Sequence, residues 1–279
     1  MVVFIRRYFI QFLILLAAGI WLSAFQMPDS ALHIIACDVG QGDAILIFKG
    51  STQILVDGGP NNKVLSCLSR YMPFWDREIE LVVLTHPERD HYFGLIEVFR
   101  RYRVDNFLSN RIASGGQGDG VLEKEVGREG VTHITPDVGK TIRVGLISLD
   151  ILHPAKDFQG KKTNDYSIVT LLKYKEFEAL LAGDIEDAIS DSIAQNWRNR
   201  VVEYIKVPHH GSKNGVSVNL LKAVMPKIAV MSVGKNNSYG HPHEEVLEML
   251  KNSNAKLLRT DEMGDVEVVT DGEKIWIED

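Results

Sequence analysis

The chain carries no excess of positive charge. Its 279 residues include 31 Lys and Arg against 37 Asp and Glu, which gives a net charge of −6 and an isoelectric point of about 5.9. Proteins that bind nucleic acid through a broad basic surface have the opposite balance. The composition therefore excludes a global basic footprint, so any contact with nucleic acid has to be local or mediated by metal ions.

Cysteine is scarce, and nucleotide-binding and repeat signatures are lacking. Cys37 and Cys67 lie in or beside apolar segments without C-x-x-C spacing, so we expect two buried free thiols. Residues 139–141 do not form a phosphate-binding loop, because Ile134 stands where that loop requires its first glycine. What remains is an ordinary globular composition, 45% hydrophobic and 24% charged, without an internal repeat.

One apolar run near the N-terminus is long. Residues 8–25 are uncharged and follow Arg6 and Arg7. The length of this run is at the short end of the range for a membrane-spanning helix. Leu22 occupies a position where signal-peptide cleavage requires a small residue, which favours an uncleaved anchor over a signal peptide. Positive charge retains the short N-terminal side in the cytoplasm, so the rest would lie outside the cytoplasmic membrane. The predicted organisation is an anchor or signal peptide (1–26), a linker (27–31) and one domain (32–279).

Apolar patterns predict alternating strands and helices along that domain. Strands are expected at residues 32–37, 44–48, 53–56, 81–84, 104–108, 142–152, 167–174, 177–181, 201–207, 226–233, 256–259, 266–270 and 274–277, and helices at 63–71, from 91 onward, at 185–197 and at 242–251. The glycine-rich residues 109–120 are expected to form a surface loop at the border of a substrate cleft.

A dense group of metal donors follows the strand at residues 81–84. His86, Glu88, Asp90 and His91 lie within six residues, and the helical spacing of apolar residues begins at His91. The donors therefore sit at a strand-to-helix junction, where a rigid strand fixes them and a loop exposes them. Imidazole and carboxylate together suit a borderline or hard divalent ion.

The second half of the domain repeats this pattern of apolar strands that end in polar donors. Asp184 follows one strand, and the adjacent His209 and His210 close another. Asp184 alone would be a turn or helix-cap residue, and His241 alone a loop histidine, whereas two neighbouring histidines after a strand favour metal ligation. Asp57, at the end of an earlier strand, is a candidate for orienting a ligating histidine.

Taken in order, these motifs resemble the metallo-β-lactamase-like domain of ComEC-type competence proteins. The motifs are D-V-G-Q-G-D-A, I-L-V-D-G-G, T-H-P-E-R-D-H, N-D-Y-S-I-V, L-L-A-G-D-I-E, K-V-P-H-H-G-S and Y-G-H-P, and they extend from Leu32 to the end of the chain. The resemblance implies an α/β fold of the metallo-β-lactamase type, a four-layer αββα sandwich with its metals at one sheet edge. Glu88 stands where the family signature H-x-H-x-D-H has its second histidine, and a carboxylate there tilts metal preference from zinc toward manganese.

The resemblance also implies roles for individual residues. Metal ligands would be His86, Glu88, Asp90 and His91, with Asp184 bridging two ions and either His209 or His210 completing the set. Residues lining the site, to bind phosphate or protonate the leaving group, would be Asn164, Ser167, Ser212 and His241. The catalytic residues would be Asp90, Asp184, His210 and His241, with Asp57 and Asp38 behind the ligands.

By this resemblance the protein is expected to be a nuclease or phosphodiesterase related to competence and DNA uptake. Two divalent ions, Mn or Zn, would activate a water for attack on DNA outside the cytoplasmic membrane, and the DNA is expected to be single-stranded. With one candidate membrane segment the chain cannot itself be a DNA channel, so a separate ComEC-type channel protein is a possible partner. Alternatives are a small-substrate hydrolase, phosphorylcholine-esterase-like or lactamase-like, and a non-catalytic binding module.

Overall fold

The structure is a computed structural model that describes residues 2–25, 30–110, 117–128, 130–197 and 200–278. The helices in these ranges are α1 (Val2–Phe25), α2 (Lys63–Tyr71), α3 (Arg89–Arg101), α4 (Gln117–Arg128), η1 (Thr163–Tyr166), α5 (Asp187–Asn196), η2 (Pro208–Gly211), α6 (Val218–Val224), α7 (Glu244–Asn252) and α8 (Thr260–Met263). The strands are β1 (Leu32–Ala36), β2 (Ile45–Lys49), β3 (Thr52–Val56), β4 (Glu78–Leu84), β5 (Arg103–Ser109), β6 (Thr132–Ile134), β7 (Thr141–Val144), β8 (Ile147–His153), β9 (Val169–Tyr174), β10 (Phe177–Leu181), β11 (Tyr204–Lys206), β12 (Ile228–Met231), β13 (Lys256–Arg259), β14 (Val266–Thr270) and β15 (Ile275–Glu278).

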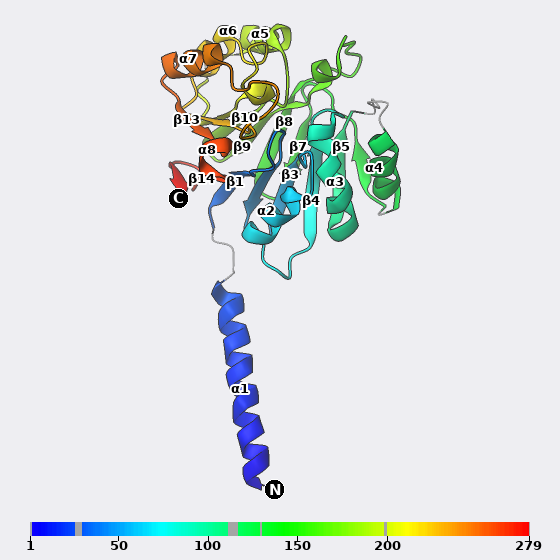
Figure 1. The fold of residues 1–279 in the computed structure, drawn as a ribbon, viewed down its shortest axis with the longest axis vertical. Helices are drawn as coiled ribbons and strands as arrows, with labels where there is room; N and C mark the ends of the chain where they lie inside the picture. Colours follow the sequence, from blue (N-terminus) through cyan, green and yellow to red (C-terminus); the bar gives the residue numbers. More distant parts are fainter. Residues whose placement is uncertain (1, 26–29, 111–116, 129, 198–199, 279) are drawn as a thin grey trace.

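The strands form two sheets. The first has the order β15-β14-β1-β2-β3-β4-β5-β6, and the second has the order β13-β12-β11-β10-β9-β8-β7. Each sheet has an antiparallel part and a parallel part, the latter running through β3 to β6 in the first sheet and β10 to β13 in the second. In Figure 1, α2, α3 and α4 lie together on one side of the molecule, and α5, α6 and α7 on the other.

Three hydrophobic cores separate the layers. Successive residues of β1 show the arrangement, because Ile34 packs into the core between the sheets while Ile35 packs with Leu95 of α3 on the outer face. On the second sheet, Ile205 of β11 packs in a third core with Leu220 of α6. Side chains alternate between the two faces of a strand, so each sheet covers a core on both sides. The predicted four-layer αββα sandwich is confirmed.

Two local predictions differ from the structure. Residues 142–152 form two antiparallel strands, since Gly145 adopts a φ of 58° and the chain reverses there. Part of the predicted loop at 109–120 is helical, because α4 begins at Gln117 and packs against α3. A side chain at Gly118 would come within 2.3 Å of the Tyr92 hydroxyl, so this glycine permits the close packing. Residues 111–116 of that stretch lie outside the described part.

The prediction of two free thiols was wrong. Cys37 and Cys67 form a disulfide, with their Cα atoms 5.9 Å apart, that ties the chain after β1 to α2. The two cysteines lie 30 residues apart in the sequence, so no local sequence motif predicts the disulfide. Only the packing of α2 against the first sheet brings them within bonding distance.

The described side chains of α1 are exposed, from Tyr8 through Trp21. Within the described residues, no helix combines the length and the apolar character needed to cross a membrane. The division into residues 1–26, 27–31 and 32–279 stays a prediction, and residues 26–29 lie outside the described part.

Candidate metal centre

Strand ends from both sheets bring the predicted donors to one place. Asp57 follows β3 and His86 follows β4, which is parallel to it, while Asp184 follows β10 and His210 follows the parallel strand β11. The carboxyl ends of neighbouring parallel strands meet at the same edge of a sheet. His91 Nε2 of the first half lies 3.2 Å from the Asp184 carboxylate of the second half, so the two edges face one another.

Asp184 lies at the middle of the cluster. Its Oδ2 is 3.2 Å from His91 Nε2 and 3.1 Å from His210 Nε2. His86, His91 and Asp184 form one group whose donor atoms all lie within 4.8 Å of one another, and Asp90, His91 and His210 form another. The two groups share His91, so the cluster offers neighbouring places for two ions. The carboxylate of Asp184 faces imidazoles from both groups, which suits the predicted bridging role.

Two histidines present an Nε2 atom to the cluster. The Nε2 atom of His86 is buried and has no hydrogen-bond partner among the described residues, and that of His210 lies 3.1 Å from Asp184 Oδ2. Their other nitrogens are engaged: His210 Nδ1 donates to the Ser232 carbonyl oxygen at 2.9 Å, and His86 Nδ1 lies 3.1 Å from the Thr85 hydroxyl. A buried nitrogen without a partner is costly, whereas a metal ion would satisfy it. The residues present therefore fit a divalent metal.

Asp57 fixes a third histidine. Its Oδ2 accepts a hydrogen bond from His91 Nδ1 at 2.8 Å, and the carboxylate also accepts from the backbone N–H and the hydroxyl of Thr85. All three residues are buried. This arrangement directs His91 Nε2 into the cluster, as expected of a carboxylate behind a ligating histidine.

Charge in the cluster is balanced between carboxylates and imidazoles. Burial opposes protonation of His210, but Asp184 and Asp43 outweigh it and raise its pKa to about 9. Burial likewise opposes ionisation of Asp184, but His210 and His91 hold its pKa well below the ordinary value. The metal-free site therefore retains protons on His210 and His91, whose pKa values are raised, whereas burial lowers the pKa of His86. Divalent ions would displace those protons and take over their role as counter-charge.

Lys206 and Asp43 belong to this site although the sequence analysis gave neither a role. Both side chains are buried, and their charged groups form an ion pair. Lys206 Nζ also lies 3.3 Å from Asp184 Oδ1 and 3.2 Å from the Gly183 carbonyl oxygen. The sequence did contain a signal, because Lys206 lies in a strand, β11, that is otherwise apolar. A lysine is almost never fully buried without a partner, so its position in this strand indicates a buried ion pair.

Asp38, predicted to lie behind the ligands, is on the surface. Its carboxylate is 3.7 Å from Lys63 Nζ and accepts a hydrogen bond from the backbone N–H of Gly40. The other carboxylate of the D-V-G-Q-G-D turn, Asp43, points inward and reaches the cluster. Its Oδ1 lies 3.6 Å from His210 Nδ1.

His209 and His210 have different surroundings. Both adopt a φ of 52°, which is strained for residues with a side chain and is commonly retained at functional sites. His210 points into the cluster, whereas His209 Nε2 lies 3.4 Å from the Asn164 side-chain nitrogen, and its ring centroid is 5.9 Å from that of His241. Of the two, His210 is placed with the candidate ligands, and His209 lies beside them with Asn164 and His241.

The remaining predicted residues support the cluster or border it. Ser167 Oγ accepts a hydrogen bond from the Asp184 backbone N–H at 3.2 Å, and the Ser212 backbone N–H donates to the His209 carbonyl oxygen. Glu88 immediately precedes α3 and belongs to none of the described donor groups. Burial and the neighbouring Asp90 raise its pKa. Metal ligation by Glu88 stays a prediction.

Two curated relatives match most of this chain. It is 26% identical over 248 residues to ComE operon protein 3 of Bacillus subtilis, covering 82% of this chain and 32% of that protein. It is 28% identical over 248 residues to Recombination protein 2 of Haemophilus influenzae, covering 87% of this chain and 29% of that protein. This chain is thus similar in sequence to these two proteins over most of its own length. It spans about a third of the length of these relatives, and no family model matches it.

Solved structures establish the fold. The metallo-β-lactamase fold protein YhfI from Bacillus subtilis has a TM-score of 0.54 at 10% identity, covering 88% of this chain and 99% of that one. CmlA, a diiron β-hydroxylase from Streptomyces venezuelae, has a TM-score of 0.56 at 15% identity, covering 90% and 55%. Zn²⁺-bound PqqB from Methylobacterium extorquens has a TM-score of 0.53 at 10% identity, covering 81% and 97%. The fold is that of the metallo-β-lactamases, which holds zinc in one of these neighbours and a diiron centre in another.

Proposed function

We propose that the protein is a metal-dependent phosphodiesterase that cleaves DNA outside the cytoplasmic membrane. The observation that carries the proposal is the pair of adjacent donor groups around Asp184, with the unpartnered Nε2 atom of His86 beside them and the Nε2 atom of His210 facing the Asp184 carboxylate. Two bound divalent ions supply Lewis-acid polarisation of phosphoryl oxygens and a water that ionises near neutral pH. Manganese and zinc are the ions we expect, since both accept imidazole together with carboxylate.

The chain's own residues have separable tasks in this proposal. His86, His91 and Asp184 would hold one ion, and Asp90 and His210 would hold the other, with His91 and Asp184 near both. The carboxylate of Asp57 keeps His91 oriented through a 2.8 Å hydrogen bond. These residues are fixed by strand ends and by neighbours that are themselves buried, so the site is organised before a substrate arrives.

Asn164, His209 and His241 would position the phosphate. They lie side by side next to the cluster without being part of the described donor groups. The amide of Asn164 and the imidazole N–H groups are hydrogen-bond donors of the kind that phosphoryl oxygens accept. We assign to this trio the binding of the substrate's phosphodiester, and to His241 the delivery of a proton to the leaving oxygen.

DNA is the substrate we favour because of the similarity to competence proteins. The acidic net charge of −6 does not oppose this choice, since divalent ions at the site would offset it locally. The Cys37–Cys67 disulfide supports a location outside the cytoplasm, because disulfides persist in oxidising compartments. A membrane-bound channel protein that delivers DNA is the partner we propose.

The test is cleavage of labelled single- and double-stranded DNA by the full chain with Mn²⁺, Mg²⁺ or Zn²⁺. Asp184→Asn should abolish cleavage, whereas Asp38→Asn, which changes a surface carboxylate, should leave it intact. Cleavage that persists after chelation or in Asp184→Asn would contradict the proposal. Hydrolysis of bis-p-nitrophenyl phosphate without any cleavage of DNA would replace it with a small-substrate esterase of the same fold.

A further inference from the structure

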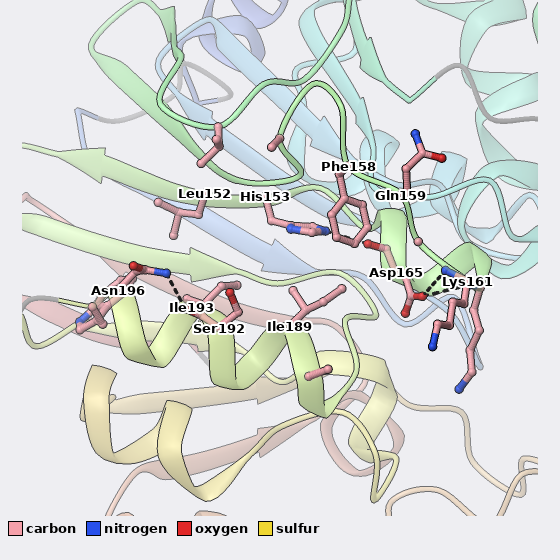
Figure 2. Close-up of a pocket in the computed structure, with 16 residues that line it drawn as sticks. Leu152, His153, Phe158, Gln159, Lys161, Asp165, Ile189, Ser192, Ile193 and Asn196 are labelled. Atoms are coloured by element: carbon pink, nitrogen blue, oxygen red, sulfur yellow. Dashed lines mark hydrogen bonds between the residues drawn. The ribbon is translucent and has the colours of Figure 1, made fainter.

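A hollow lies beside η1, the turn that also carries Asn164. It has a volume of about 750 Å³ and is formed by the end of β8, the loop that follows it, and one face of α5. Figure 2 shows Leu152, His153 and Phe158 on one side of the hollow and Ile189 and Ile193 of α5 on the other. Its size is within the range of sites that bind small organic groups, about 300–1,000 Å³. No residue of the candidate metal cluster lines it.

One short turn separates this pocket from the metal cluster. In η1, Asn164 reaches His209 on the cluster side, while the next residue, Asp165, lines the pocket. The Asp165 carboxylate accepts hydrogen bonds from the backbone N–H groups of Lys161 and Lys162, at 2.7 and 3.0 Å, and so fixes this part of the pocket lining. Adjacent residues thus face the two sites, so one extended molecule can occupy both.

The pocket walls suit a flat heterocycle. Phe158 packs edge-on against His153, with ring centroids 4.5 Å apart, and Trp197 closes the far end of α5. Aromatic and aliphatic walls of this kind bind nucleobases by stacking. Gln159 and Asn196 also line the pocket, and amide side chains pair with the donors and acceptors on base edges.

The pocket lining includes two lysines, in a protein whose net charge is −6. Lys161 and Lys162 both line it and are exposed. Lys162 pairs with Glu186 at 2.5 Å, whereas the Lys161 ammonium has no ion pair within the described residues. A free ammonium beside an apolar, aromatic hollow suits a nucleotide. The flat base can pack in the hollow, and the anionic phosphate can pair with the ammonium.

We infer that this pocket binds a nucleobase of a single-stranded polynucleotide while a phosphodiester of the same strand lies at the metal cluster. The inference rests on the proposed function. It adds that the protein prefers single-stranded to double-stranded polynucleotides. In a duplex the bases are paired and stacked within the helix, and only an unpaired base is free to enter a pocket. Lys161 then contacts the backbone phosphate next to the bound base.

The experiment separates binding from cleavage. Fluorescence anisotropy of a labelled single-stranded 12-mer is measured with the metal-free full chain, alongside an abasic 12-mer of the same charge. Phe158→Ala should weaken 12-mer binding by about tenfold, since stacking on an aromatic side chain is worth about 1–3 kcal/mol per base. Phe158→Leu keeps the side chain apolar and should weaken 12-mer binding similarly. This variant is a control that distinguishes the loss of stacking from a loss of folding. Phe74→Ala, an exposed aromatic outside the pocket lining, is the matched control and should bind normally.

Lys161→Ala should weaken binding of both oligomers, and Phe158→Ala should affect the abasic one less than the base-containing one. Equal loss for both oligomers in Phe158→Ala, or no loss in either Phe158 variant, would overturn the pocket assignment. Turnover of bis-p-nitrophenyl phosphate by the metal-loaded wild-type protein reports on the metal centre separately. If the wild-type protein turns over bis-p-nitrophenyl phosphate while the Phe158 variants bind the 12-mer normally, the pocket inference fails and the phosphodiesterase proposal stands. If the wild-type protein shows no turnover while the Phe158 variants bind the 12-mer weakly, the phosphodiesterase proposal fails and the pocket inference stands.

Discussion

Lys206 and Asp43 form an ion pair in the interior of the protein, with both side chains about 1% exposed. The pair lies against the candidate metal centre, because Lys206 Nζ is also 3.3 Å from Asp184 Oδ1. Taking two charges out of water is costly, and each member of such a pair depends on the other for compensation. Lys206 thus connects the D-V-G-Q-G-D turn of the first half to the carboxylate at the centre of the cluster.

Lys206→Met should destabilise the protein strongly, because it removes the ion-pair partner of the buried Asp43 carboxylate. The expected loss is about 3–5 kcal/mol of the free energy of unfolding. Urea unfolding of the metal-free protein measures it. The double variant Lys206→Met/Asp43→Asn should recover much of the loss, since no unpaired charge remains. A double variant as unstable as the sum of the single variants would contradict this account of the pair.

Asp57→Asn should weaken metal binding without removing a ligand. The amide cannot hold the His91 Nδ1–H as the carboxylate does, and loss of such a partner lowers metal affinity about 10–100-fold. Competition with a chromogenic chelator gives the affinity for Mn²⁺ or Zn²⁺. Asp38→Asn is the matched control, because Asp38 is on the surface, and it should bind metal like the wild type. Unaltered affinity in Asp57→Asn would show that this hydrogen bond does not orient a ligand.

The metal-free protein should lose stability as the pH rises from 6.5 toward 9. The pKa of His210 is about 9 in the folded protein and near 6.5 in an unfolded chain. A raised folded-state pKa stabilises the folded protein fully below the unfolded value, and the effect is lost as the pH passes the folded value. The pKa of His91 is also raised, by Asp184 and Asp57 against the opposing effect of burial, so it acts in the same direction.

For His210 alone the loss is on the order of 3 kcal/mol. Urea unfolding at several pH values, after treatment with EDTA, measures it. The metal-loaded protein is the control and should depend less on pH over this range, because bound ions replace the protons on the imidazoles. Stability that increases with pH in the metal-free protein would refute the charge balance described for the cluster.

Removing the Cys37–Cys67 disulfide should destabilise the domain. The bond closes a segment of 30 residues, and a disulfide of this span contributes about 2–4 kcal/mol, chiefly by restricting the unfolded chain. The variant Cys37→Ser/Cys67→Ser should melt at a lower temperature than the wild type. Dithiothreitol should lower the melting temperature of the wild type and leave that of the variant unchanged. If the wild type and the variant melt together under oxidising conditions, the two thiols are not joined.

Much of the fold could be predicted because its local signals are strong. The apolar run at 81–84 followed by His86 and His91 predicted a strand, a donor loop and a helix, and β4 and α3 are in those places. α4 was missed because its glycines predict a loop, and its helical structure depends on packing against α3. The disulfide was missed for a related reason, since only tertiary packing brings Cys37 near Cys67.

Some residues of the candidate site could be predicted from the sequence, and others could not. Asp90 and Asp184 stand out because each follows a buried strand closely, and both lie in the described cluster. Asp38 and Asp43 occupy the same turn motif, and only the three-dimensional course of that turn shows that Asp43 points inward. His209 and His210 are indistinguishable in the sequence, and the local backbone decides which of them enters the cluster.

The measurement that tests the central claim most directly is the location of bound metal. Crystals of the full chain soaked in Mn²⁺ should give two anomalous-scattering peaks at the cluster, one among His86, His91 and Asp184 and one beside Asp90 and His210. Asp184→Asn should lose at least one of them. Crystals that bind manganese elsewhere, or that show no peak at these side chains at millimolar Mn²⁺ or Zn²⁺, would contradict the assignment of a dinuclear metal centre.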